Sequence, residues 1–179
     1  MDPANSSTDD DRIMHLLIAG SAEELEREAA ANPRFPHGVD ERLGRCWIIN
    51  AIDYGSLHAI VWMITKGVDL SFVDEEGTTV LLSALDRGQP DRHEVLGLLL
   101  RSGARTDLHG INDWTAAHMA ASRDDAEALR ILKRHGADLG AIRNDFGITT
   151  PLDDARTLKC WKAVAFLERA LSEDAAAGR

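Results

Sequence analysis

Residues 110–122 read GINDWTAAHMAAS, and this stretch decides the fold because it combines a turn with the start of a helix. The Asn112-Asp113 pair favours a turn. Thr115 can cap a helix by accepting hydrogen bonds from the backbone N–H groups two and three residues later. The alanines that follow have small side chains, so the helix can pack closely against a neighbour. Trp114 stands between turn and cap, at a corner that is usually polar.

The same pattern occurs twice upstream. The segments GRCWIINAI (44–52) and GTTVLLSAL (77–85) align with DWTAAHMAA (113–121). The residue at the cap position is Cys46, Thr79 or Thr115 in the three copies. A small residue stands five positions after the cap in each copy: Ala51, Ala84 and Ala120. The alignment therefore predicts a repeated helix that starts after a turn.

A second helix is expected in each copy after a polar break. Its apolar residues recur at helical spacing, as in Leu96, Leu99 and Leu100. The aligned segments MITKGVDL, LLRSGART and LKRHGADL then share a glycine that can end the helix in the left-handed conformation: Gly67, Gly103 and Gly136. Because such a helix pair is apolar on one side, it cannot bury that side alone. The copies are therefore expected to stack.

The aligned copies resemble ankyrin repeats, which have a period of about 33 residues and the signature Gly-x-Thr-Pro-Leu-His, followed later by Gly-Ala-Asp. HGAD (135–138) is the closest match, and TAAHMAA (115–121) keeps the Thr, the His and the alanines. GITTPLDDA from Gly147 keeps Gly, Thr, Pro and Leu, with one residue too many and no His. The resemblance covers about residues 12–171, if IMHLLIAGSAEELEREAAANP is a first repeat without its turn and LDDARTLKCWKAVAFLERAL a last one.

This resemblance implies an all-α ankyrin-repeat solenoid of about five stacked helix-turn-helix repeats with short projecting turns. The repeats are expected at about 12–40, 41–73, 74–109, 110–143 and 144–171, and the first and last are atypical caps. An acidic flexible tail is expected over 1–11 and a second tail over 172–179. Polar residues on the terminal helices, such as Glu23 and Lys162, predict ends that discourage further stacking, and hence a monomer.

The composition is typical of a globular chain, with 44% apolar and 28% charged residues. A net charge of −10 repels nucleic acid and anionic membranes and favours a basic partner. The chain does not begin with a secretion signal, and no apolar run approaches the roughly 20 residues that span a bilayer, so a cytoplasmic location is expected. Cys46 and Cys160 lack the spacing of a zinc knuckle or a disulfide framework.

No catalytic or cofactor motif is present: the sequence has no phosphate loop, no His-Glu-x-x-His, no Gly-x-Ser-x-Gly and no calcium loop. His118 occupies the signature position, where its ring is expected to tie neighbouring loops together. Asp153 and Asp154 point in different directions on a helix, and Cys46 has no histidine in register. We therefore expect no catalytic residue, no metal site and no cofactor.

The resemblance implies a non-catalytic protein–protein interaction module that binds its partner through a concave face of turn tips and first helices. Such a module can be an inhibitor, for example a bacterial toxin-neutralising immunity protein. The alternatives are a bacterial effector, or an adaptor or scaffold that captures a host or cellular factor. An enzyme with an unrecognised site in the groove is the disfavoured class. The fold alone does not identify the partner.

Trp114 has two possible roles. As a hydrophobic staple it would fold back onto Met119. As an interface anchor it would project from the concave side, because the aligned copies place Arg45 and Thr78 in its column. The anchor hypothesis predicts that Trp114→Ala weakens binding about thirtyfold or more and shifts the melting temperature by only a few degrees.

The predicted partner-binding set combines an apolar strip with a charged rim. Ile148 is expected in the column of Trp114, and Tyr54 and Arg123 at the exposed ends of first helices. The complete set is Trp114, Ile111, Phe146, Ile148, Tyr54, Arg123, Asp53, Glu75, Glu76 and Asp145, with Asp74 as a further acidic candidate.

Overall fold

The computed structural model describes residues 3–143 and 148–178, which form ten α-helices, one short 3₁₀ helix and no β-strand. The α-helices are α1 (Pro3–Ala19), α2 (Ala22–Ala31), α3 (Trp47–Tyr54), α4 (Leu57–Thr65), α5 (Val80–Asp86), α6 (Arg92–Arg101), α7 (Ala116–Ser122), α8 (Ala126–Arg134), α9 (Pro151–Leu158) and α10 (Trp161–Ala176). The 3₁₀ helix η1 covers Ile111–Asp113.

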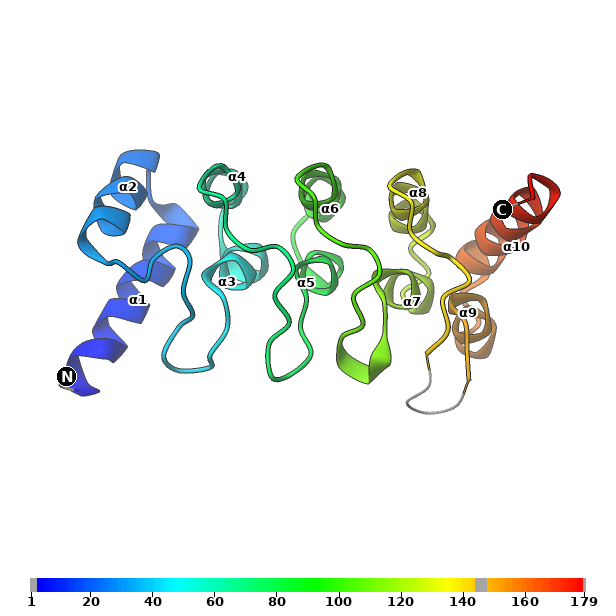
Figure 1. The fold of residues 1–179 in the computed structure, drawn as a ribbon, viewed down its shortest axis with the longest axis horizontal. Coiled ribbons are helices and arrows are strands. Elements are labelled where there is room, and N and C mark those ends of the chain that lie inside the picture. Colours follow the sequence, from blue (N-terminus) through cyan, green and yellow to red (C-terminus); the bar gives the residue numbers. More distant parts are fainter. Residues whose placement is uncertain (1–2, 144–147, 179) are drawn as a thin grey trace.

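The helices stack as pairs along one axis, with the two ends of the chain at opposite ends of the stack (Figure 1). The first helices of successive pairs contact one another in the order α1, α3, α5, α7 and α9. The second helices lie in another row, in which α2 contacts α4, and α8 contacts both α6 and α10. The predicted all-α solenoid of five helix pairs is therefore confirmed.

Five of the ten described α-helices begin at a side chain that accepts a hydrogen bond from the first turn: α2, α4, α5, α8 and α9. Thr79 Oγ1 accepts from the N–H of Leu82 at 3.2 Å. Thr150 Oγ1 accepts from the N–H of Asp153 at 3.3 Å, and the Asp153 carboxylate accepts from the N–H of Thr150 at 3.0 Å. This reciprocal pair is a capping box, and it fixes the start of α9.

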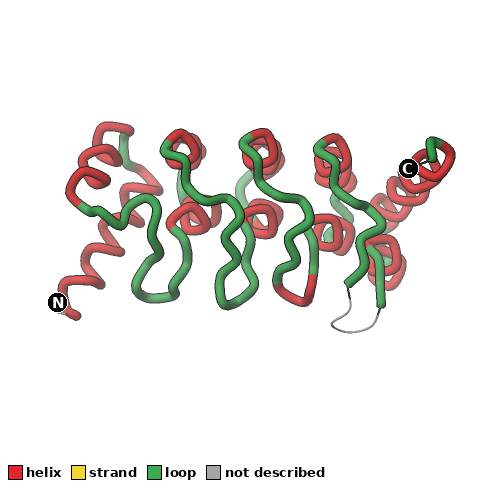
Figure 2. The backbone as a smooth tube through the Cα atoms, viewed as in Figure 1, coloured by secondary structure: helices red, strands yellow, loops and turns green. Residues whose placement is uncertain are grey.

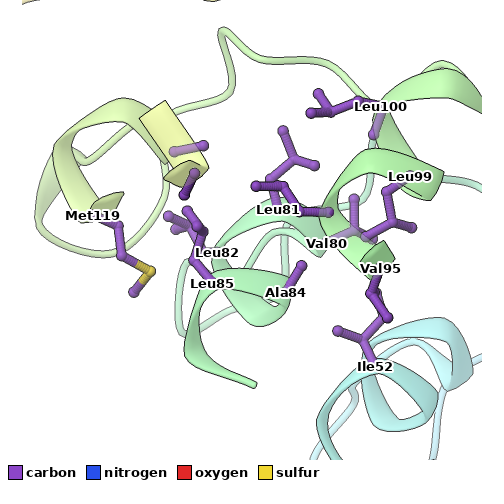
Figure 3. Packing of buried hydrophobic residues seen from close by; sticks show 14 of the residues in the cluster. Ile52, Val80, Leu81, Leu82, Ala84, Leu85, Val95, Leu99, Leu100 and Met119 are labelled. Carbon is purple, nitrogen blue, oxygen red and sulfur yellow. The ribbon is translucent and has the colours of Figure 1, made fainter. Parts of the chain in front are cut away.

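The core lies between the two helix rows and continues through all five pairs. Figure 3 shows part of it, with Val80, Leu81 and Leu85 of α5 packed beside neighbouring helices. The alanines after the cap positions, such as Ala84 and Ala120, are fully buried. Their small side chains allow adjacent first helices to approach closely, as the sequence predicts.

The link between the first and second helix pairs is irregular in backbone but packed in its side chains. Phe35 is buried between two tryptophans, with its ring centroid 5.6 Å from that of Trp62 and 6.1 Å from that of Trp47. Aromatic contacts of this kind stabilise a segment that has no regular hydrogen-bond ladder. The link is therefore anchored on the second helix pair, to which both tryptophans belong.

The terminal tails differ from the prediction. Helix α1 begins at Pro3 and α10 runs to Ala176, so most of the segments 1–11 and 172–179 is helical. One reason is that Asp10 is buried and its Oδ2 accepts from the N–H of Glu41 at 2.9 Å, which ties α1 to the next turn. Long-range contacts of this type are not visible in the composition of the segment.

Candidate partner-binding groove

The loops between helix pairs project on one side of the helix rows (Figure 2). We call the surface formed by these loops and the exposed sides of the first helices the groove face. Isolated antiparallel bridges join the two arms of three loops, at Val39–Cys46, Val73–Thr79 and Arg143–Thr149. In the remaining loop η1 forms the tip.

Two buried carboxylates hold the first two loops in shape. Asp74 Oδ1 accepts from the N–H groups of Glu76 at 3.0 Å and Thr78 at 2.6 Å. Asp40 Oδ1 accepts in the same way from the N–H of Leu43 at 2.6 Å. Asp74 was predicted as an acidic contact for a partner, but it is only 8% exposed and serves the loop instead. Carboxylates that accept from backbone N–H groups hold loops in one conformation, so partner-facing groups on these loops are pre-positioned.

A cavity of about 330 Å³, here called the central cavity, opens on the groove face between α3, α5 and the loops beside them. Its lining is Arg45, Asp53, Glu76, Thr78, Leu82, Ser83, Asp86, Ile111 and Met119. Leu82 and Met119 are almost fully buried, whereas Ile111 is 48% exposed. Figure 3 shows Met119 of α7 beside Leu82 and Leu85 of α5. The cavity thus has an apolar floor and an acidic border.

Ion pairs organise the border of the central cavity. Asp53 Oδ2 accepts from Arg45 Nη2 at 2.6 Å, and its Oδ1 accepts from Ser83 Oγ at 2.7 Å. Asp86 pairs with Arg123 across the next repeat. Asp53 and Asp86 occupy equivalent positions of α3 and α5. The groove face therefore carries carboxylates that link successive repeats.

A smaller cavity of about 180 Å³, the N-terminal cavity, lies next to the central one and shares Arg45 with it. Its lining is Asp10, Asp11, Met14, Asp40, Arg42, Leu43, Arg45, Asn50 and Tyr54. Leu43 is 68% exposed and Tyr54 is 56% exposed. Large apolar groups that stay exposed next to a cavity are typical of interaction surfaces.

The predicted site residues divide into those that line a cavity and those that do not. Tyr54 lines the N-terminal cavity, and Asp53, Glu76 and Ile111 line the central cavity. Arg123 lies at the central border through its pair with Asp86.

The other predicted residues lie on the same loops or beyond the described part of the chain. Glu75 is exposed on its loop and lines neither cavity. Phe146 and Asp145 lie outside the described residues. Ile148 is 79% exposed, but the helix cap is Thr150, so Thr149 and not Ile148 shares the column of Trp114. Thr150 is selected as the cap because Asp153 then stands three residues later and completes the capping box.

Trp114 is half-buried and packs against the core, which neither predicted role describes fully. The Arg143 guanidinium lies over its ring, with Cζ 6.0 Å from the ring centroid. Trp114 Nε1 is buried and has no hydrogen-bond partner among the described residues. Neither the central nor the N-terminal cavity includes Trp114 in its lining. Its side chain therefore contributes to packing between repeats.

Leu43 was not predicted, although the alignment contains a signal for it. It precedes Gly44 as Glu76 precedes Gly77, so the two residues hold equivalent positions at the tips of adjacent loops. Gly77 has a φ of +78°, and its carbonyl oxygen accepts from the N–H of Ile111 at 2.7 Å in the next loop. A side chain at Gly77 would collide with that backbone. Met14 gave no such signal, because the first helix pair lacks the repeat signature.

Two buried titratable groups, Cys46 and His118, have pKa values that burial shifts. Burial raises the pKa of the Cys46 thiol to about 11, so this thiol stays protonated at neutral pH. Burial lowers the pKa of His118, whose Nδ1 accepts from the N–H of Thr115 at 3.3 Å. The described residues contain no group of three metal-ligand side chains. None of the described helices is long and apolar enough to cross a membrane.

The stacked helix pairs and the loops that project beside them define a helical repeat protein of the solenoid class. The family model of the ankyrin repeat matches residues 112–145. The chain is 34% identical over 110 residues to the "Ankyrin repeat and KH domain-containing protein mask-1" of Caenorhabditis elegans. The aligned residues are 61% of this chain and 4% of the worm protein. Residues 112–145 thus match an ankyrin repeat, and the chain is similar to ankyrin repeat proteins over about three fifths of its length.

A second relative is named "Probable E3 ubiquitin-protein ligase XBOS34", from Oryza sativa subsp. japonica. It is 30% identical over 111 residues, which is 61% of this chain and 21% of the rice protein. The chain thus spans only a small part of the length of both relatives. The similarity is to a segment of each relative and not to the whole protein.

Proposed function

We propose that the chain binds one partner protein through its groove face and acts by holding that partner, without catalysis. The observation that carries this proposal is the pair of adjacent cavities on one face, bordered by loops that buried carboxylates hold in place. Ankyrin repeats in general are protein-interaction modules. A rigid surface loses little conformational entropy on binding, which favours specific recognition.

The partner is expected to be basic where it meets the groove face. The chain has a net charge of −10, and Glu75, Glu76 and Asp86 are exposed on or beside this face. Opposite charge on the partner would speed association by electrostatic steering. These carboxylates therefore favour a partner whose contacting surface is basic.

The simplest finer role is inhibition, of which a toxin-neutralising immunity protein is one form. The alternative is an effector, adaptor or scaffold, and the names of the two relatives fit a module within a larger assembly. The two roles differ in what binding does to the partner. An inhibitor abolishes the partner's own activity at saturation, whereas an adaptor leaves that activity intact.

The test is site-specific photo-crosslinking in the native cell with the full chain. A photoreactive phenylalanine analogue replaces Ile111, which is 48% exposed on the groove face, or Val61, which is 41% exposed on α4 in the second helix row. We expect one stoichiometric adduct from position 111 and none from position 61. Equal labelling from both positions, or an adduct from position 61 alone, contradicts the proposal.

The free chain is proposed to be a monomer. Glu23 and Lys162 are exposed on the first and last helix pairs, and charged groups there oppose end-to-end stacking. Light scattering at micromolar concentration tests this, and a stable dimer would contradict it.

A further inference from the structure

Two adjacent loops of the groove face have an apolar residue and an acidic residue at the same position. Leu43 and Glu76 stand at equivalent loop tips, and each lines the cavity beside its own loop. One cavity therefore has an apolar side chain at its border where the next has a carboxylate. The two cavities thus differ at this one loop-tip position, and this difference suits a ligand with two different groups.

Arg45 separates the two cavities and lines both. Its side chain is only 12% exposed, with Nη2 2.6 Å from Asp53 Oδ2 and Nε 3.6 Å from Asp74 Oδ2. The guanidinium charge is thus already matched by carboxylates of the chain. Arg45 therefore forms the wall between the two cavities. Because its charge is paired, it does not oppose a cation in the central cavity.

The central cavity has the chemistry to hold a lysine or arginine side chain. Leu82, Met119 and Ile111 offer an apolar surface for the aliphatic part of such a side chain. Glu76 and Asp86 lie at the border, and Glu76 forms no ion pair with any described residue. Around the cavity, the carboxylates outnumber the guanidinium groups of Arg45 and Arg123. A cation of the partner in this cavity would neutralise the remaining negative charge.

The N-terminal cavity has the chemistry to hold an apolar side chain. Met14, Leu43 and Tyr54 form its apolar part, and the last two are more than half exposed. Burial of a leucine or phenylalanine side chain there would remove apolar surface of both molecules from water, which favours binding. Arg42 also lines this cavity, and its Nη1 lies 3.3 Å from Asp11 Oδ1.

We infer that the two cavities together bind one extended segment of the partner, with an apolar side chain in the N-terminal cavity and a lysine or arginine in the central cavity. Neighbouring packed helices lie about 8 to 10 Å apart, and an extended chain advances about 3.3 Å per residue. The two anchor residues are therefore about two to four positions apart. This inference rests on the proposed function, because it specifies what the groove face recognises.

The test uses synthetic peptides and the full chain. The reference probe is acetyl-Gly-Ser-Leu-Ser-Ser-Arg-Ser-Gly-amide, with companions that have one or three serines between Leu and Arg. Binding is followed by amide chemical shifts in ¹H–¹⁵N spectra. We expect saturable shifts at the loops of Leu43 and Glu76, which disappear when the peptide Leu becomes Ser or its Arg becomes Gln.

Matched variants of the chain separate the two cavities. Leu43→Ser is expected to weaken the peptide about tenfold, and Glu76→Gln about fivefold, as expected for an apolar contact and an exposed ion pair. Leu158→Ser and Glu94→Gln are the controls, because both residues are exposed and line neither cavity. Equal affinity of all four variants and the wild type overturns the inference.

The position of the shifts distinguishes this inference from the proposed function. Shifts confined to α9, a first helix that lines neither cavity, would contradict the two-cavity site and leave a groove-face interaction standing. Shifts only on α4, α6 and α8 would contradict both. Absence of binding by every spacing of the peptide overturns the inference, while the crosslinking experiment still decides the proposed function.

Discussion

Replacing Arg87 should destabilise the middle of the solenoid more than any exposed arginine does. Its side chain is fully buried, and it donates to the carbonyl oxygens of Ile52 and Gly55 in the preceding repeat, the latter at 3.1 Å. It also pairs with Asp91 in a two-pronged contact of 2.7 and 3.0 Å. Arg87→Met keeps much of the volume and leaves all these acceptors without their donor.

The expected loss follows from the cost of breaking a buried charged network. Removal of one partner from such a network costs about 3 to 5 kcal/mol, because the remaining groups stay buried and unpaired. Since the Asp91 side chain is 24% exposed and water can reach it, we expect the lower end, about 3 kcal/mol. For a chain of this size that corresponds to a fall in melting temperature of about 6 to 12 °C. Arg87→Lys should recover little, because lysine lacks the planar fork.

The assay is thermal and urea unfolding followed by circular dichroism, with Arg101→Met as the control. Arg101 is an exposed residue of α6 whose loss should cost less than about 0.5 kcal/mol. Hydrogen bonds from Arg87 lower the pKa of Asp91, so this part of the stability is present above about pH 4 and declines as pH falls through the lowered pKa. Equal melting temperatures for Arg87→Met and Arg101→Met would refute the reasoning.

Three further predictions concern packing, pH and salt. Trp114→Ala should lower the free energy of unfolding by about 2 kcal/mol, half the usual loss for a buried tryptophan, because this side chain is only half-buried. The melting temperature should fall by about 4 to 8 °C. An unchanged melting temperature together with lost partner binding would support the anchor hypothesis instead. Burial lowers the pKa of His118, so its contribution to stability is complete above about pH 6.5 and is lost as pH falls through the folded pKa. The urea midpoint of His118→Gln should therefore depend less on pH between about 7 and 5 than the wild-type midpoint does. Parallel curves for the two proteins would contradict this. Association with the partner should slow as salt rises, because exposed charges are screened over about 8 Å at physiological ionic strength; stopped-flow rates that do not change with salt would remove the electrostatic part of the proposal.

The sequence by itself determined the repeat, the helix starts and several groove-face residues. Thr79 and Thr150 cap helices through contacts that reach only three residues along the chain. The glycines that end the second helices are equally local, and Gly67 and Gly103 have positive φ values as expected. Tyr54 and Ile111 could be placed on the groove face because a repeat transfers the geometry of one copy to the next. Interactions between residues a few positions apart can be predicted from the spacing of residue types along the sequence.

Only the tertiary structure decided the features that depend on contacts between repeats. The burial of Arg87 rests on acceptors 32 and 35 residues away, and the half-buried state of Trp114 on Arg143 of the next repeat. The N-terminal cavity required α1 to pack against a loop whose residues are 31 positions away. The physical reason is that burial and pairing depend on which faces meet when helix pairs stack, and equivalent positions such as those of Arg87 and Tyr54 meet different neighbours in each repeat.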